Sequence, residues 1–258
     1  MLLGYIGKLW EDKDLMRRCL VVAVPLMLQS LVVNSVTLVD NLMIGRLGDA
    51  ALSGVSSANR YYILVNFCCL AITSAGVIFL SQYYGADNEK KMKECFRILT
   101  LFSLLAALAF VLLAHFFPEA ILRFIIDDDA VVALGSSYLK ICLFSYGPTV
   151  LSVCIASSIR ALGRTKVPMV ISICSVLLNV LFDYVLIFGH FGFRPMGVEG
   201  AAYATLLARL IEMALYLLIL KLSDYPFKSE LRDFLFFDVS LMKTILKTAI
   251  PLLINEFL

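Results

Sequence analysis

The strongest constraint on the fold is a series of six apolar runs, each long enough to cross a lipid bilayer. A helix needs about 20 predominantly apolar residues to span a hydrocarbon core of about 30 Å. The six runs cover, within a few residues, 19–44, 58–84, 97–117, 131–159, 167–189 and 198–220. Another apolar segment opens at Leu241. The sequence therefore predicts an all-α polytopic membrane protein with a six-helix transmembrane bundle and the start of a seventh helix.

The composition supports a lipid environment. Of the 258 residues, 61% are hydrophobic and 16% are charged, whereas soluble domains contain about 45–50% apolar and about 25% charged residues. A soluble chain of this length could not hide that excess from water. The net charge of +2 is too small and too dispersed to indicate nucleic-acid binding. We therefore expect the chain to be surrounded by lipid and not to bind a nucleic acid.

The distribution of basic residues predicts the orientation. Summed over alternate connections, Lys and Arg number 16 on one side of the predicted spans and 4 on the other. Cytoplasmic loops carry the excess of basic residues. We therefore expect a cytoplasmic N-terminus and odd-numbered helices that run outward.

An internal repeat predicts how the chain is divided. The segment 15–32, LMRRCLVVAVPLMLQSLV, recurs at 241–258 as LMKTILKTAIPLLINEFL, with six of 18 positions identical, Pro25 and Pro251 among them. The offset of 226 residues contains six helices, so a second copy would start in the cytoplasm like the first, a common plan in transporters. We predict an N-terminal bundle over 1–222, a cytoplasmic connecting loop over 223–240 and the start of a C-terminal bundle over 241–258. On this interpretation the chain is part of a protein of about 450 residues.

Acidic residues inside the spans are the first candidates for function. A carboxylate at the bilayer centre costs about 2.5–3.5 kcal/mol on insertion scales, and such residues usually serve a function. Four acids qualify: Asp40, Asp183, Glu212 and Glu256.

Two of these acids are predicted to meet at one depth. Asn179 and Asp183 are four residues apart and share a helix face, and Asp183 lies about 26 Å along a helix that enters from the cytoplasm. Asp40 lies late in a helix of the same direction, and Thr205 lies early in the next helix, which runs inward. These four residues would form an oxygen-rich site suited to Na⁺ or to a proton. The alternatives are that Asp40 caps the turn that follows it and that Asp183 snorkels outward.

The remaining polar positions carry weaker predictions. Glu212 follows Arg209 by three residues, which favours a structural ion pair, whereas Glu256 lies in the incomplete seventh helix and cannot be placed. Pro25 is expected to kink the first helix, because proline removes a backbone hydrogen bond. Three amide side chains either line a substrate cavity or tie helices together by hydrogen bonds: Gln29, Asn34 and Asn66.

Motifs of enzymes are missing from the sequence. The two histidines, His115 and His190, lie at the ends of spans, and the chain has no HExxH, GxSxG or Walker motif. We therefore predict a protein that is not an enzyme and that uses no cofactor, with Na⁺ or H⁺ as its only ion.

Four motifs together resemble the MATE (multidrug and toxic compound extrusion) family, in particular its bacterial DinF-like branch. They are, in chain order, PLMLQSLVVNSVTLVDNLMIGRLGDAAL at 25–52, SQYYGAD at 81–87, LLNVLFDYVLIFG at 177–189 and GVEGAAYAT at 197–205. The resemblance extends through PLLINEFL at the end of the chain. Each motif alone is weak, but their order and spacing are specific. The missing C-terminal bundle is the departure from the family pattern.

The resemblance implies one repeat of a twelve-helix fold in which two bundles face each other across a central cavity. It also implies export of organic, often cationic compounds in exchange for Na⁺ or H⁺ across the bacterial inner membrane. In that branch the coupling ion binds at positions that match Asp40, Asn179, Asp183 and Thr205. Two alternatives are a lipid-linked oligosaccharide flippase of the same superfamily, which would need several basic residues in its cavity, and a non-transporting membrane protein built from one half-repeat.

Overall fold

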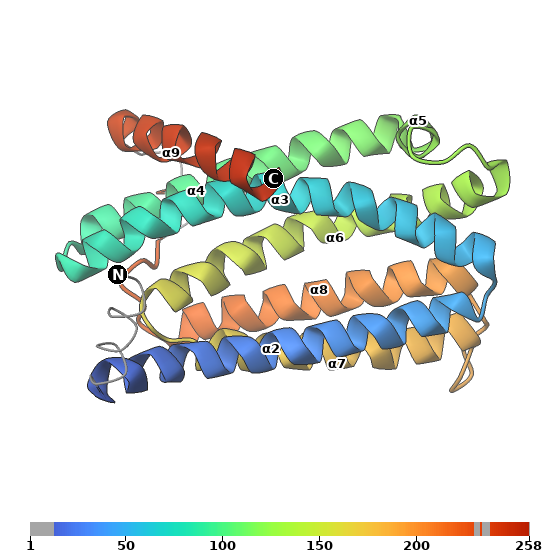
Figure 1. The fold of residues 1–258 in the computed structure, drawn as a ribbon, viewed down its shortest axis with the longest axis horizontal. Coiled ribbons are helices and arrows are strands. Elements are labelled where there is room, and N and C mark those ends of the chain that lie inside the picture. Colours follow the sequence, from blue (N-terminus) through green and yellow to red (C-terminus); the bar gives the residue numbers. More distant parts are fainter. Residues whose placement is uncertain (1–12, 230–232, 234–237, 258) are drawn as a thin grey trace, which may run out of the picture.

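The computed structural model describes residues 13–229, 233 and 238–257, and every regular element in this part of the chain is a helix. The longer helices run side by side along the molecule (Figure 1). Their bounds are α2 (Lys13–Gly45), α3 (Asp49–Gly85), α4 (Glu89–Phe116), α5 (Pro118–Arg123), α6 (Asp129–Ala161), α7 (Lys166–Phe188), α8 (Gly197–Leu222) and α9 (Val239–Phe257).

The six predicted spans are confirmed as helices, and the same six are long and apolar enough to cross a membrane. Their ends differ from the prediction where the helix continues beyond its apolar part. The 37 residues of α3, which begins at Asp49, correspond to about 55 Å, well beyond the apolar run predicted to start at residue 58. The short helix α5 was not predicted, because six residues are too few to show a periodic pattern.

Short polar side chains fix the helix ends on both sides of the bundle. Asn88 caps α4 by accepting a hydrogen bond of 3.1 Å from the backbone N–H of Lys91. Asp128 caps α6 by accepting from the backbone N–H groups of Ala130 and Val131 at 2.9 and 3.2 Å. Both contacts satisfy amides that a helix start leaves without an internal partner. The caps thereby set where the chain reverses between neighbouring spans.

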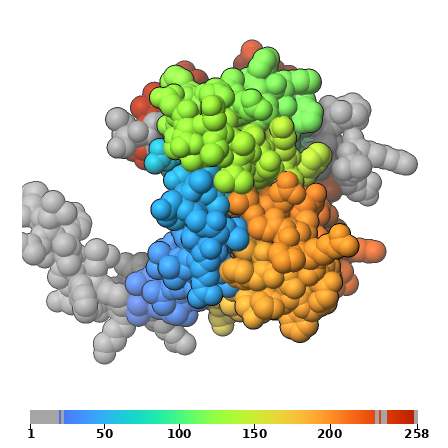
Figure 2. Space-filling view, turned by 90° about the vertical axis from the view of Figure 1, so that its right-hand side faces the viewer, coloured from blue at the N-terminus to red at the C-terminus, as the bar shows by residue number. Residues whose placement is uncertain are grey.

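Helices α3 and α6 form the centre of the bundle, where α3 also contacts α4 and α9, and α6 also contacts α4 and α8. Helix α7 packs on α8, and α2 packs mainly on α7. In the end-on view, α8 and the end of α7 (orange) lie beside the beginning of α3 (blue), and the segment from α4 to α6 (green) lies above them (Figure 2). The site-bearing helices α2, α7 and α8 therefore share one side of the molecule.

Glycine allows the two central helices to approach closely. A Cβ atom on Gly54 of α3 would lie 2.9 Å from the backbone nitrogen of Gly135 on α6, and one on Gly135 would lie 2.8 Å from the carbonyl oxygen of Gly54. Small residues are common where membrane helices touch backbone to backbone. This crossing sets the spacing of α3 and α6, which both line the cavity described below.

The predicted kink at Pro25 stays a prediction. Pro25 is buried within α2, which is helical from Lys13 to Gly45. The predicted division into an N-terminal bundle over 1–222, a connecting loop and a C-terminal bundle from residue 241 also stays a prediction. In the structure α8 ends at Leu222 and α9 begins at Val239.

Candidate functional site

A cavity of about 280 Å³ lies among α2, α3, α6, α7 and α8. Three of the four predicted ion-binding residues line it, namely Asp40 of α2, Asn179 of α7 and Thr205 of α8. The other lining residues are Thr37, Asn59, Tyr62, Ile63, Tyr138, Cys142, Ser145, Tyr146, Thr149 and Arg209. The structure thus brings residues from five helices, separated by up to 172 positions between Thr37 and Arg209, to one cavity.

Asp183 is completely enclosed just behind this cavity. Its side chain is 0% exposed, and neither of its carboxyl oxygens has a hydrogen-bond partner in the described part of the chain. The carboxyl groups of Asp183 and Asp40 adjoin one another. Because ionised carboxylates only accept hydrogen bonds, two adjoining carboxylates cannot satisfy each other unless one of them carries a proton. The enclosure of Asp183 contradicts the alternative in which this residue snorkels outward.

An amide side chain on the same helix as Asp183 also has a nitrogen that lacks a partner in the part of the chain that the structure describes. Asn179, one turn earlier on α7, has a buried amide nitrogen without an acceptor among the described residues. The alternative role of Asp40 as a cap of the turn that follows α2 stays a prediction.

The cavity and its surroundings carry several oxygen-bearing side chains. No group of three or more His, Cys, Asp or Glu side chains suited to a metal ion occurs among residues 13–229, 233 and 238–257. Asp40, Asn179 and Thr205 bring a carboxyl, an amide and a hydroxyl group to the cavity, and Asp183 adjoins Asp40. Hard cations prefer oxygen ligands of these kinds.

Tyrosine rings form one wall of the cavity and were missed in the sequence analysis. Tyr62 and Tyr146 have ring centroids 5.2 Å apart, and Tyr138 lies beside Thr205 and Cys142. The signal was present along α6, where the lining residues recur with the period of one helix face: Tyr138, Cys142, Ser145, Tyr146 and Thr149. On an apolar helix, however, such a pattern is also typical of ordinary packing against neighbouring helices.

The predicted ion pair between Arg209 and Glu212 is confirmed. Nη1 of Arg209 lies 2.7 Å from Oε2 of Glu212, and the hydroxyl of Ser175 donates to the same oxygen at 3.3 Å. Arg209 also lines the cavity one turn after Thr205. The cavity therefore carries a positive group whose charge is already compensated.

The three predicted substrate residues lie outside this cavity. Gln29 has a buried Oε1 without a donor among the described residues, Asn34 is exposed on α2 and Asn66 is half-buried on α3. Their role in a larger cavity between two bundles stays a prediction. The side chain of Glu256 lies outside the described residues.

Relatives of known sequence resemble this chain over most of its length. The probable multidrug resistance protein YoeA of Bacillus subtilis is 28% identical over 238 residues, which cover 91% of this chain and 51% of that protein. A probable multidrug resistance protein NorM of Agrobacterium fabrum is 30% identical over 186 residues, which cover 71% of this chain and 39% of that protein. The chain thus spans about half the length of the curated relatives it matches, or less. The assignment to the DinF-like branch stays a prediction.

Solved structures share the fold. A mutant of the Vibrio cholerae MATE transporter VcmN superposes with a TM-score of 0.84 at 19% identity, over 95% of this chain and 54% of that one. A MOP superfamily transporter from Pyrococcus furiosus superposes with a TM-score of 0.83 at 19% identity, over 93% and 52%. A family model described as MatE matches residues 25–185. Because this match covers more than half of the chain, the chain belongs to the MATE family.

Proposed function

We propose that this chain forms the N-terminal half of a secondary transporter that exports organic, often cationic compounds in exchange for Na⁺ or H⁺. Asp40, Asn179, Asp183 and Thr205 bind the coupling ion. The observation that carries the proposal is Asp183, enclosed at 0% exposure without a hydrogen-bond donor and adjoining a second carboxyl group. The names of the relatives, probable multidrug resistance proteins, support the class of cargo.

The electrostatics of the pair explain why a cation binds there. A buried charge without a partner is strongly destabilising, and two adjoining carboxylates repel each other in a medium of low dielectric constant. A Na⁺ ion or a proton removes both penalties. The site therefore alternates between an occupied form and an empty form with different preferred geometries.

Such an alternation drives export only if ion and cargo favour different states of the protein. Asp40 lies on α2, the helix that contains Pro25 and packs mainly on α7. Neutralising Asp40 and Asp183 weakens their repulsion, and this changes how α2 sits on α7. Movement of one bundle against the other then exposes the cavity to either side of the membrane.

The cavity suits an organic cation. The faces of Tyr62 and Tyr146 attract cations, and Asp40 supplies a carboxylate at the same cavity. A cation held there competes electrostatically with the coupling ion, which is the requirement for exchange.

The flippase alternative needs unpaired basic residues that bind phosphate. Arg209 is the basic residue among those that line the described cavity, and its charge is compensated by Glu212. An anionic carrier therefore finds no uncompensated cation there. The half-repeat alternative is decided by the intact mass of the native protein, since 28.7 kDa supports a true half and about twice that mass supports two repeats.

Ethidium efflux from vesicles that contain the native full-length protein tests the proposal, first with a Na⁺ gradient and then with a pH gradient. We expect one gradient to drive efflux and Asp183→Asn to abolish it. Asp127→Asn, the same substitution at an exposed position, is the matched control and should keep full efflux. Full activity of Asp183→Asn would contradict the site, and no efflux from folded wild-type protein under either gradient would contradict the function. Protease added to one side of the same vesicles tests whether the N-terminus of the protein lies on the cytoplasmic side of the inner membrane.

A further inference from the structure

The connection between α8 and α9 is anchored to the bundle by an aromatic cluster. Phe227 is 0% exposed, its ring centroid lies 4.9 Å from that of Phe96 on α4, and it stacks on Tyr225 at 5.4 Å. The guanidinium of Arg164 lies over the ring of Tyr225, 5.4 Å from its centroid. A fully buried phenylalanine ties this connection to the first bundle within the segment predicted to be a cytoplasmic connecting loop.

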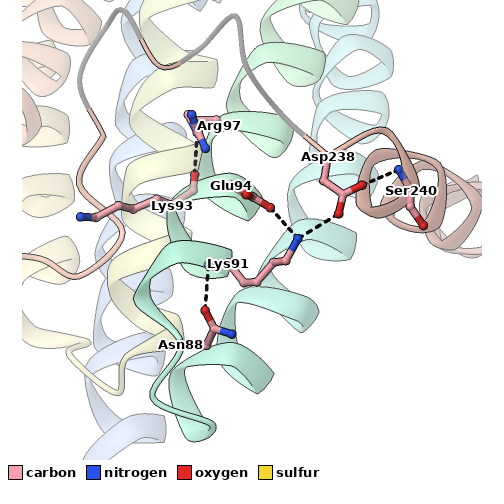
Figure 3. Close-up of polar contacts among 7 residues, drawn as sticks. All are labelled: Asn88, Lys91, Lys93, Glu94, Arg97, Asp238 and Ser240. Carbon is pink, nitrogen blue, oxygen red and sulfur yellow. Dashed lines mark hydrogen bonds and ion pairs between the residues drawn. The ribbon is translucent and has the colours of Figure 1, made fainter.

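Polar contacts continue the attachment up to the start of α9. Nζ of Lys91 lies 2.9 Å from Oδ2 of Asp238 and 2.8 Å from Oε2 of Glu94, so that one ammonium group bridges two carboxylates (Figure 3). The other oxygen of Asp238 accepts a hydrogen bond of 2.8 Å from the backbone N–H of Ser240. Asp238 therefore both caps α9 and fastens it to α4. Nη1 of Arg97 also donates to the carbonyl oxygen of Asp233 at 2.6 Å.

The first turns of α9 complete the contact with an apolar face. Leu241, Ile245 and Ala249 are buried, and their spacing of four residues places them on one side of the helix. Helix α9 packs against α3 and α4. In the internal repeat this helix is the first element of the second copy, yet it packs against two helices of the first copy (Figure 1).

We propose that these contacts form a cytoplasmic clamp through which the first repeat holds the start of the second, and that the clamp stays closed while the cavity opens and closes. The cytoplasmic clamp consists of Lys91, Phe96 and Arg97 of α4 with Phe227, the carbonyl of Asp233, and Asp238. Its partner surface is the beginning of the second repeat. The two bundles then move about this point, whatever the cargo or the coupling ion.

The charges of the clamp persist under conditions that change a proton-coupled site. The hydrogen bond from Lys91 holds the pKa of the Asp238 carboxyl below its ordinary value. The groups that face Asp238 are the Lys91 ammonium and, through it, the Glu94 carboxylate. Because the pKa is lowered, the pair is complete at neutral pH and is lost only as the pH falls through the lowered value. A pH gradient in the physiological range therefore leaves the clamp intact.

Hydrogen exchange on the native full-length protein tests the attachment without any transport measurement. Lys91→Gln and Asp238→Asn each remove one charge, and asparagine keeps the capping oxygen for Ser240. We expect each variant to speed exchange of the first α9 amides by up to about fivefold, and the double variant to do no more than either single one. Lys90→Gln, at the exposed neighbouring lysine, is the matched control and should change nothing. Independent, additive effects of the two substitutions would overturn the ion-pair part of the clamp.

The aromatic anchor at Phe227 and the proposal that the clamp stays closed are tested by separate hydrogen-exchange measurements. Phe227→Ala should raise exchange of the 223–229 amides by on the order of 100-fold, because a large buried ring is lost. In the wild-type protein, exchange over 223–229 and over the first turns of α9 should be the same with and without Na⁺, with ethidium, and at pH 6 and pH 8 after correction for intrinsic rates. Loss of protection under any of these conditions would show a gate that opens and would overturn the fixed clamp. Failure of ethidium efflux alone bears on the proposed function and leaves these readouts unchanged.

Discussion

Arg209 and Glu212 form an ion pair of 2.7 Å in which the arginine faces the cavity and the glutamate is enclosed between helices. The side chains are 31% and 8% exposed, respectively. Glu212 therefore neutralises the positive charge of a residue that lines the cavity. This arrangement leaves Asp40 and Asp183 as the carboxyl groups at the cavity that have no basic partner among the described residues.

Removing Glu212 should destabilise the bundle. Glu212→Ala leaves Arg209 without its counter-charge, and breaking a buried pair in this way costs about 3–5 kcal/mol. The partial exposure of Arg209 reduces the expected loss to about 1–3 kcal/mol. Thermal unfolding in detergent measures it. The double variant Arg209→Met with Glu212→Leu should recover most of the loss, and a double variant as unstable as Glu212→Ala would contradict the charge explanation.

The coupling ion should stabilise the folded protein through Asp183. A ligand that binds only the folded state stabilises it by about 2.7 kcal/mol at 100 times its Kd. We expect NaCl, compared with choline chloride, to raise the Tm of the full-length protein if Na⁺ is the ion. Asp183→Asn should lose this shift, and Asp127→Asn should keep it. An equal Na⁺ shift in Asp183→Asn and the wild type would place the ion elsewhere.

The glycine contact between the central helices should tolerate no side chain. Gly135→Ala places a Cβ 2.8 Å from the carbonyl oxygen of Gly54, which forces α3 and α6 apart and costs about 1–3 kcal/mol. Gly147→Ala is the matched control on the same helix, since a Cβ there meets nothing within 4 Å. That variant should be neutral or stabilising by up to about 1 kcal/mol, because alanine favours a helix. Unfolding midpoints of the two variants make the comparison.

The faces of the tyrosine rings that line the cavity should contribute to the binding of ethidium. Tyr146→Ala should raise the KM for ethidium by about two- to thirtyfold, because a cation–π contact contributes about 0.5–2 kcal/mol. Tyr146→Phe keeps the ring and should stay within about twofold of the wild type. A phenylalanine variant as impaired as the alanine variant would point to the hydroxyl group and not to the ring face.

The features that the sequence could predict are those that depend on one segment of the chain at a time. Run lengths predicted the six spans, because hydrophobic thickness is a one-dimensional property of the chain. The prediction that Asp40, Asp183 and Thr205 lie at a similar depth rests on the same kind of information, since each helical residue advances by about 1.5 Å. The pair Arg209 and Glu212 was also predictable, because residues three apart on a helix are neighbours.

The angular placement of side chains around the bundle was decided only by tertiary packing. The sequence could not show that Asp183 is enclosed, that Gln29, Asn34 and Asn66 lie outside the described cavity, or that a tyrosine stripe lines it. Each of these outcomes depends on which neighbouring helix covers which face, and an apolar span presents few polar marks to distinguish its faces.

The sequence by itself thus determined the number and approximate extent of the apolar helices, and it identified the charged residues within them. The tertiary structure alone decided that Asp183 is enclosed, where α9 attaches and how closely α3 and α6 approach. The physical reason is that burial in a bilayer is set by the length and polarity of each segment separately. Contacts between segments arise instead from the close fit of small residues, rings and caps that are far apart in the chain.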